Sequence, residues 1–199
     1  MAYDKFEVLT STAFPLPIEN VDTDQIIPAR FLKATERKDF DINFFRDWRF
    51  EADGTPKADF PLNKEIHAGS QILVGGRNFG SGSSREHAAW SVYDFGLRCV
   101  ISSEFADIFK NNCLNVGVLP VQVSAEFADS LFAAIEADPK AEITVDLPNE
   151  KVTLVATGES ESFVINKYKK DNMLNGFDDI DYLKNIEGEI TTFAETRPF

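Results

Sequence analysis

The sequence is poor in cysteine, histidine and positive charge. Its 199 residues include two cysteines, Cys99 and Cys113, which are too few for a disulfide framework or a cysteine-rich zinc site. Only 20 Lys and Arg residues stand against 33 Asp and Glu residues, a formal net charge of -13. Because nucleic acids and anionic membranes are bound through clustered Lys and Arg, this deficit argues against both kinds of partner.

Long apolar runs are missing as well. Nowhere do 18 uncharged apolar residues follow one another, and the N-terminal residues show no basic stretch ahead of an apolar one. We therefore expect neither a membrane span nor a secretory signal, and we expect a cytoplasmic protein.

The apolar content that is present suits one folded domain. Hydrophobic residues make up 43% of the chain and charged residues 27%, and a chain of this length can bury about 70% of its unfolded surface. Phenylalanine is in excess, with 18 residues. Any that the core cannot hold would face a partner, so we expect several at a subunit interface.

Short strands and helices alternate through the middle of the chain. Strands are expected over residues 5–16, 71–74, 98–102 and 116–123, with a hairpin over 142–156 and a third strand near 162–165. Helices are expected from about residue 88 to 95, over 104–111, and over 125–137 with Ser124 as its cap. The charged, aromatic stretch near 33–61 is expected to be an irregular excursion outside the core. This interleaving is α/β, but the short strands argue against a plain doubly wound sheet.

A glycine-rich loop, residues 75–86, joins a predicted strand to a predicted helix. Gly80 and Gly82 supply G-x-G, but Arg85 stands where a dinucleotide fingerprint needs its third glycine. The loop has no Lys for a P-loop and no G-x-S-x-G frame for a serine-hydrolase elbow. These three functions are therefore set aside.

Two interpretations of the loop stay open. Ser83 and Glu86 have the spacing of a capping box, which would only start the helix. Capping does not account for Arg85 beside Ser83 and Ser84 at a helix start, where free N–H groups and the helix dipole already favour an anion. Carboxylate binding explains the whole group, because Arg can hold a carboxylate through two parallel hydrogen bonds.

The residues also carry a family resemblance. Residues 76–89 resemble the signature of the mobile C-terminal "swivel" domain of the aconitase superfamily. Residues 22–33, 105–120 and 174–180 are similar to the small subunits of bacterial 3-isopropylmalate dehydratases, in the same order. The resemblance implies a three-layer β/β/α swivelling domain over residues 1–199, with the tail 167–199 as an appended helical segment.

This resemblance also implies a function. The chain would be half of a heterodimeric or heterotetrameric hydro-lyase of leucine biosynthesis, which dehydrates 2-isopropylmalate and rehydrates the alkene to 3-isopropylmalate. In the family a [4Fe-4S] cluster sits on the large subunit, and two isolated cysteines cannot supply the usual three-cysteine site, so this chain is expected to bind none. Two other functions stay open. One is the small subunit of a related hydro-lyase of the homoaconitase or citraconate/methylmalate type, and the other is a non-catalytic carboxylate-binding module.

Site residues follow from the same resemblance. Ser83 matches the serine that acts as general base, and Ser84 and Arg85 match groups that bind the substrate carboxylate. Arg30 and Lys33 lie in the segment that contributes to recognition of the substrate's side-chain end.

Four further side chains are not expected to take part in the chemistry. Thr23 and Asp24 are expected to fix their turn through bonds to backbone. Of the two histidines, His87 is expected to pack on its helix and His67 to lie on the surface.

Overall fold

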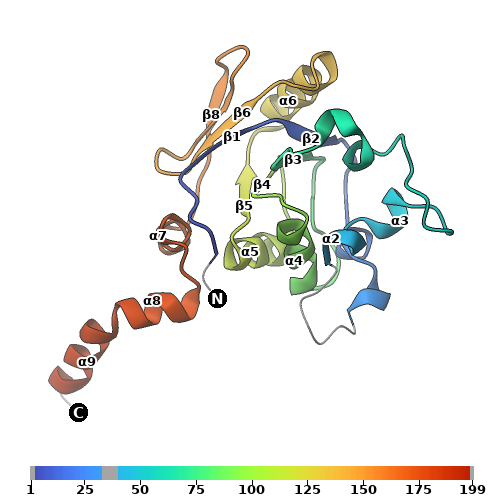
Figure 1. Cartoon of the computed structure of the whole chain (residues 1–199). Coiled ribbons are helices and arrows are strands. Elements are labelled where there is room, and N and C mark those ends of the chain that lie inside the picture. Colours follow the sequence, from blue (N-terminus) through green and yellow to red (C-terminus); the bar gives the residue numbers. More distant parts are fainter. Residues whose placement is uncertain (1–2, 33–39, 198–199) are drawn as a thin grey trace.

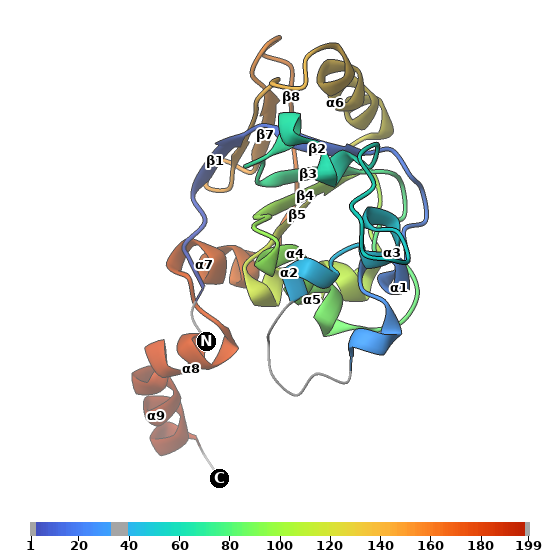
Figure 2. The ribbon, with the colours of Figure 1, turned by 45° about the vertical axis from the view of Figure 1, so that its right-hand side comes forward.

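A parallel and an antiparallel sheet lie face to face, with helices on the far side of the parallel sheet (Figures 1 and 2). The computed structural model describes residues 3–32 and 40–197. In that range the parallel sheet has the order β2-β3-β4-β5, and the antiparallel sheet β1-β6-β7-β8. The parallel strands are β2 (Ala13–Leu16), β3 (Ile72–Gly75), β4 (Cys99–Ser102) and β5 (Leu119–Gln122). The antiparallel strands are β1 (Val8–Ser11), β6 (Ile143–Asp146), β7 (Lys151–Leu154) and β8 (Ser160–Ser162).

Most helices surround the parallel sheet. They are α1 (Thr23–Ile26), α2 (Phe40–Asn43), α3 (Arg46–Arg49), α4 (Glu86–Asp94), α5 (Asp107–Val116) and α6 (Ala125–Ala137). Three single 3-10 turns are η1 (Ala29–Phe31), η2 (Pro61–Asn63) and η3 (Glu65–His67). The tail forms α7 (Lys167–Asn175), α8 (Asp179–Asn185) and α9 (Glu187–Thr196). No helix in the described ranges is both long and apolar enough to cross a lipid bilayer.

The alternation of side chains along each parallel strand divides the core in two. In β3, Ile72 and Val74 point into the core between the sheets, whereas Leu73 points into the core beneath the helices. The first core also takes the apolar face of α6, and the second takes α4 and α5. The expected three-layer β/β/α architecture is therefore confirmed.

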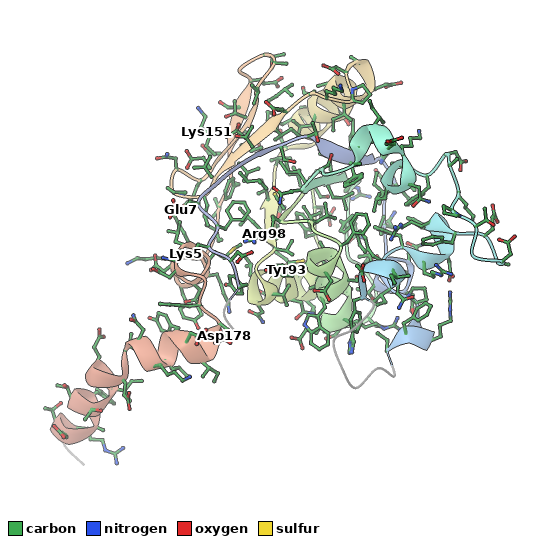
Figure 3. The ribbon with its side chains drawn as sticks, in the orientation of Figure 1. Lys5, Glu7, Tyr93, Arg98, Lys151 and Asp178 are labelled. Carbon is green, nitrogen blue, oxygen red and sulfur yellow. The ribbon has the colours of Figure 1, made fainter. Side chains whose placement is uncertain are left out.

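The N-terminal stretch differs from its prediction. Residues 8–16 form one strand in each sheet, because the chain leaves the antiparallel sheet after Ser11 and enters the parallel sheet at Ala13. The segment before β1 is held by Arg98, whose Nη2 donates to the Asp4 carbonyl at 2.6 Å. Its guanidinium lies 5.4 Å from the Tyr93 ring centroid (Figure 3).

The aromatic stretch before residue 61 is irregular, as expected, apart from the short helices α2 and α3, but part of it lies in the core and not outside it. Phe40, Phe44 and Phe45 are fully buried, and the Phe40 ring meets the Trp90 ring of α4 edge-on at 5.7 Å. Phe45 has a left-handed backbone (φ 50°), so the two short helices α2 and α3 share no common period that a sequence pattern could reveal. Residues 33–39 lie outside the described residues. Among the residues that the structure describes, ten phenylalanines are buried: Phe6, Phe14, Phe40, Phe44, Phe45, Phe79, Phe105, Phe109, Phe127 and Phe163.

The helix with a clear capping residue and apolar face lies where the sequence predicts it. Helix α6 covers 125–137 as predicted, and the Ser124 hydroxyl accepts from the Phe127 amide at 3.1 Å. Helix α5 begins at Asp107 rather than 104, and the third antiparallel strand is 160–162 rather than 162–165.

His67 is buried, not on the surface as predicted. Its side chain lies against Phe14, with ring centroids 5.9 Å apart, and its Nδ1 has no hydrogen-bond partner among the described residues. Burial lowers the pKa of His67, the charge of Lys64 lowers it further, and a hydrogen bond with the Ala13 backbone opposes both. The neutral imidazole is therefore the form that the fold accommodates.

We expect the free energy of unfolding to fall as the pH is lowered below about 6.5. The unfolded chain then binds a proton at residue 67 that the folded chain resists, so protonation favours unfolding. Urea titrations between pH 5 and 8, on the wild type and His67→Leu, would measure this. The variant should lose less stability towards pH 5 than the wild type. Equal losses in the two proteins would contradict the assignment.

Candidate active site

The glycine-rich loop leaves β3 at the carboxyl edge of the parallel sheet and is held on both sides by backbone. On one side, the Gly80 and Ser81 amides donate to the Val21 carbonyl at 2.8 and 3.0 Å. The Thr23 amide donates to the Ser81 carbonyl at 2.8 Å. The segment that follows β2 therefore continues alongside the loop that follows β3.

On its other side the loop pairs with the segment that follows β4. The Phe79 amide donates to the Glu104 carbonyl, and the Ala106 amide donates to the Phe79 carbonyl, both at 3.0 Å. Arg77 adds an exposed ion pair with the Glu104 carboxylate at 3.2 Å. The loop thus lies between two neighbouring connections, which fixes its path across the edge of the sheet.

Glycine is required where the loop meets α5. Gly80 has a φ of +79°, and a Cβ there would lie 2.2 Å from the Phe109 Cγ atom. Since Phe109 is itself fully buried, its ring has no free space into which to move.

The capping box predicted for Ser83 and Glu86 is wrong. Helix α4 begins at Glu86, with Arg85 in the N-cap position and no side chain capping it. Instead the Ser83 carbonyl accepts from the Thr23 hydroxyl at 2.9 Å, which holds Ser83 outside the helix. In the first turn of α4 the Ala88 amide donates to the Arg85 carbonyl at 3.2 Å. The Glu86 and His87 amides are not taken by a capping side chain, and they point towards the end of the loop.

Ser83 and Ser84 are exposed, and neither hydroxyl has a hydrogen-bond partner among the described residues. Arg85, directly after them, is mostly buried, with 17% of its side chain exposed. Two exposed hydroxyls, a guanidinium and an uncapped helix start therefore share one short segment. This arrangement suits a small anion.

Asp24 is the partner that sequence reasoning missed. Its carboxylate forms an ion pair with Arg85 through Nη1. The turn itself is fixed by Asp22, which caps α1 and accepts from the Gln25 amide at 2.8 Å. Asp24 was expected to bind backbone, and that expectation is wrong because Asp22 already fills this role. The run Asp22-Thr23-Asp24 indicates a turn. The contact between Asp24 and Arg85, 61 positions later, leaves no local pattern in the sequence.

The two predicted recognition residues are not joined to the loop. Arg30 lies in η1, pairs with Asp47, and has 54% of its side chain exposed. Within the described ranges it makes no hydrogen bond or ion pair with residues 83–85. Lys33 lies outside the described residues.

His87, as expected, packs on its helix, 4.7 Å from the Trp90 ring. Both cysteines are buried and unpaired. Cys99 lies in the core between the sheets and Cys113 in the core beneath the helices, and burial raises the pKa of both thiols. No group of three His, Cys, Asp or Glu residues within 3–32 and 40–197 could hold a metal ion. The cysteines do not fit an iron–sulfur cluster, because thiolate ligands must converge on one accessible point.

Comparison with known proteins places the chain in a family. Residues 3–126 match the family model of the aconitase C-terminal domain, and residues 129–166 match the LeuD_N model. The chain is 55% identical to the 3-isopropylmalate dehydratase small subunit of Cytophaga hutchinsonii, covering 98% of this chain and 97% of that protein. The chain belongs to the family of 3-isopropylmalate dehydratase small subunits.

Other members of this small-subunit family agree. The small subunit of Christiangramia forsetii is 54% identical, over 98% of this chain and 94% of that protein. The crystal structure of a 3-isopropylmalate dehydratase chain from Methanocaldococcus jannaschii superposes with a TM-score of 0.68. At 24% identity, over 93% of this chain and 98% of that one, this likeness supports the fold. Helices α7 to α9 follow the last residue of both family models.

The tight approach of the loop to α5 is testable. Gly80→Ala should lower the free energy of unfolding by about 2–4 kcal/mol, since it adds overpacking against Phe109 to an unfavourable φ. Gly158→Ala is a matched control, because Gly158 also has a positive φ (+74°) but no atom within 4 Å of the new Cβ. It should cost about 1 kcal/mol. Equal losses in chemical denaturation would contradict the close contact.

Proposed function

We propose that this chain, together with a large subunit, interconverts 2-isopropylmalate and 3-isopropylmalate by dehydration and rehydration. The observation that carries the proposal is the segment Ser83–Arg85, in which two hydroxyls without a partner among the described residues precede a guanidinium at an uncapped helix start. Family membership names the reaction class, and the segment supplies groups that suit it.

Ser83 is proposed as the general base. It would take the proton from the carbon next to the one that bears the leaving hydroxyl, and return a proton there in the reverse direction. A serine hydroxyl is far too weak an acid to ionise in water at pH 7. Its ionised form needs converging N–H groups, a nearby cation and exclusion of water. The start of α4 and Arg85 provide the first two, and a partner covering the exposed Ser83 would provide the third.

Arg85 and Ser84 are proposed to hold a substrate carboxylate. The contact with Asp24 engages only Nη1, and the remaining guanidinium nitrogens have no partner among the described residues. A planar guanidinium held at one corner keeps an edge for a bidentate carboxylate. We therefore infer that Asp24 is a positioning residue that orients Arg85.

A large subunit is proposed to complete the enzyme, as a heterodimer or heterotetramer. We place the [4Fe-4S] cluster on that subunit, where it would supply Lewis-acid chemistry, because the cysteines of this chain do not fit one. Neither subunit would be active alone. Arg30 is proposed to lie towards the side-chain end of the substrate, which requires its exposed pair with Asp47 to open.

Replacing the proposed base gives the first test. Ser83→Ala should lower kcat of the reconstituted complex by about 10²–10⁴-fold, because proton transfer loses its acceptor. Assembly and stability should change little, since the hydroxyl is exposed and has no partner among the described residues. Ser162→Ala, at an exposed serine of β8 whose hydroxyl has no partner among the described residues, is the matched control and should leave turnover unchanged. If Ser83→Ala kept activity within about tenfold, the base assignment would be wrong.

A double-mutant cycle tests the Arg85–Asp24 pair. Arg85→Lys keeps the charge but loses the planar fork, so KM for 2-isopropylmalate should rise at least about tenfold. Asp24→Ala should raise KM by a smaller factor, because Arg85 loses its anchor. The double variant should be no worse than Arg85→Lys alone, since residues that act as a unit are not additive. Additive effects in steady-state kinetics would show that Asp24 does not act through Arg85.

A further inference from the structure

The C-terminal helices α8 and α9 carry apolar side chains that the rest of the described chain does not cover. Neither helix has a single buried residue. Four large hydrophobic side chains are exposed there, from 46% for Ile190 to 72% for Phe193. We call these four the apolar tail residues: Ile180, Leu183, Ile190 and Phe193.

Their spacing puts them on helix faces. Ile180 and Leu183 are three residues apart in α8, as are Ile190 and Phe193 in α9, so each pair shares one face of its helix. Both views show α8 and α9 extending away from the sheets (Figures 1 and 2). Helices of 7 and 10 residues are only marginally stable in water without tertiary packing. A partner that buries these faces would therefore stabilise them.

Charge narrows the choice of partner. Residues 178–197 contain six acidic and two basic residues, a net charge of -4, of which the Lys169 pair with Asp179 offsets one. A second copy would bring the same negative charge to the contact, and an anionic lipid surface would also repel it. A protein groove with an apolar floor and a basic rim is the complementary surface.

The start of α8 also lies close to the candidate active site. Asp178 caps α8 (Figure 3), and Ile180 lines a groove of about 230 Å³. Glu86, the residue after Arg85, lines the same groove. A subunit that covers Ser83–Arg85 can therefore extend along this groove onto α8 without leaving the surface of the chain.

We propose that the apolar tail residues form a docking surface for the large subunit. This inference rests on the proposed function, because that function requires a partner over Ser83–Arg85. The large subunit should present an apolar groove with Lys or Arg at its rim to α8 and α9. Phe193 would then be one of the phenylalanines that lie at the subunit interface and not in the core.

The test compares two double variants of the full chain by calorimetric titration with the cognate large subunit. Leu183→Gln with Phe193→Gln removes two apolar tail residues. Val155→Gln with Val164→Gln is the matched control and removes two exposed apolar side chains just after strands β7 and β8. They are 47% and 85% exposed, against 49% for Leu183 and 72% for Phe193. We expect Kd to rise at least tenfold in the first variant and less than twofold in the second.

Each outcome decides the proposal. If both variants bind the large subunit as tightly as the wild type does, the proposed docking surface is wrong. The proposed function would still stand in that case, provided that the wild-type chain binds the large subunit and the complex has isomerase activity. A second result would also overturn the proposal. If the wild-type chain self-associates, and the tail variant is a monomer with an unchanged Kd for the large subunit, the apolar tail residues bind a second copy of the chain. Hydrogen exchange on the wild-type chain gives a check that needs no substitution. Amides of residues 179–196 should slow when the large subunit is added, and unchanged rates would overturn the proposal.

Discussion

The candidate site depends on the pairing between the segment after β2 and the loop after β3. The Val21 carbonyl takes two loop amides, Thr23 holds the Ser83 carbonyl, and Asp24 holds the Arg85 side chain. The two segments are about 60 residues apart in sequence. They meet because β2 and β3 are adjacent and parallel, so their carboxyl ends share one edge. The position of the proposed catalytic and binding groups thus follows from the order of the strands, which the cores on the two faces of the parallel sheet maintain.

The carboxyl edge of the parallel sheet also explains why the loop has a fixed position although it is irregular. Backbone hydrogen bonds from neighbouring connections on both sides replace the ladder that the loop leaves at the end of β3. Glycine at residue 80 lets it lie directly on the Phe109 ring. The backbone is therefore positioned by many weak bonds, while the Ser83 and Ser84 side chains stay exposed. That combination suits a site whose second half arrives with another subunit.

The sequence predicted the parts of the fold that local signals determine. Helix α6 was found because Ser124 caps it and an apolar face recurs with the helical period. The layer order and the loop at the site followed from the family resemblance and from strand–helix alternation. Burial of His67 and of Phe40–Phe45, and the contact between Asp24 and Arg85, depend on residues distant in sequence. The false capping box had the right local spacing, but a tertiary bond from Thr23 overrode it.

The uncapped start of α4 limits which substitutions can be used to stabilise the chain. An uncapped helix forgoes about 1 kcal/mol that a capping side chain would add. A stabilisation strategy guided by helix propensity would therefore choose residue 85 as an early target for Ser, Thr or Asp. That substitution would remove the guanidinium and occupy the amides at the start of α4 that are proposed to stabilise the ionised form of Ser83. A more heat-resistant variant should therefore be sought by substitutions at positions other than residue 85.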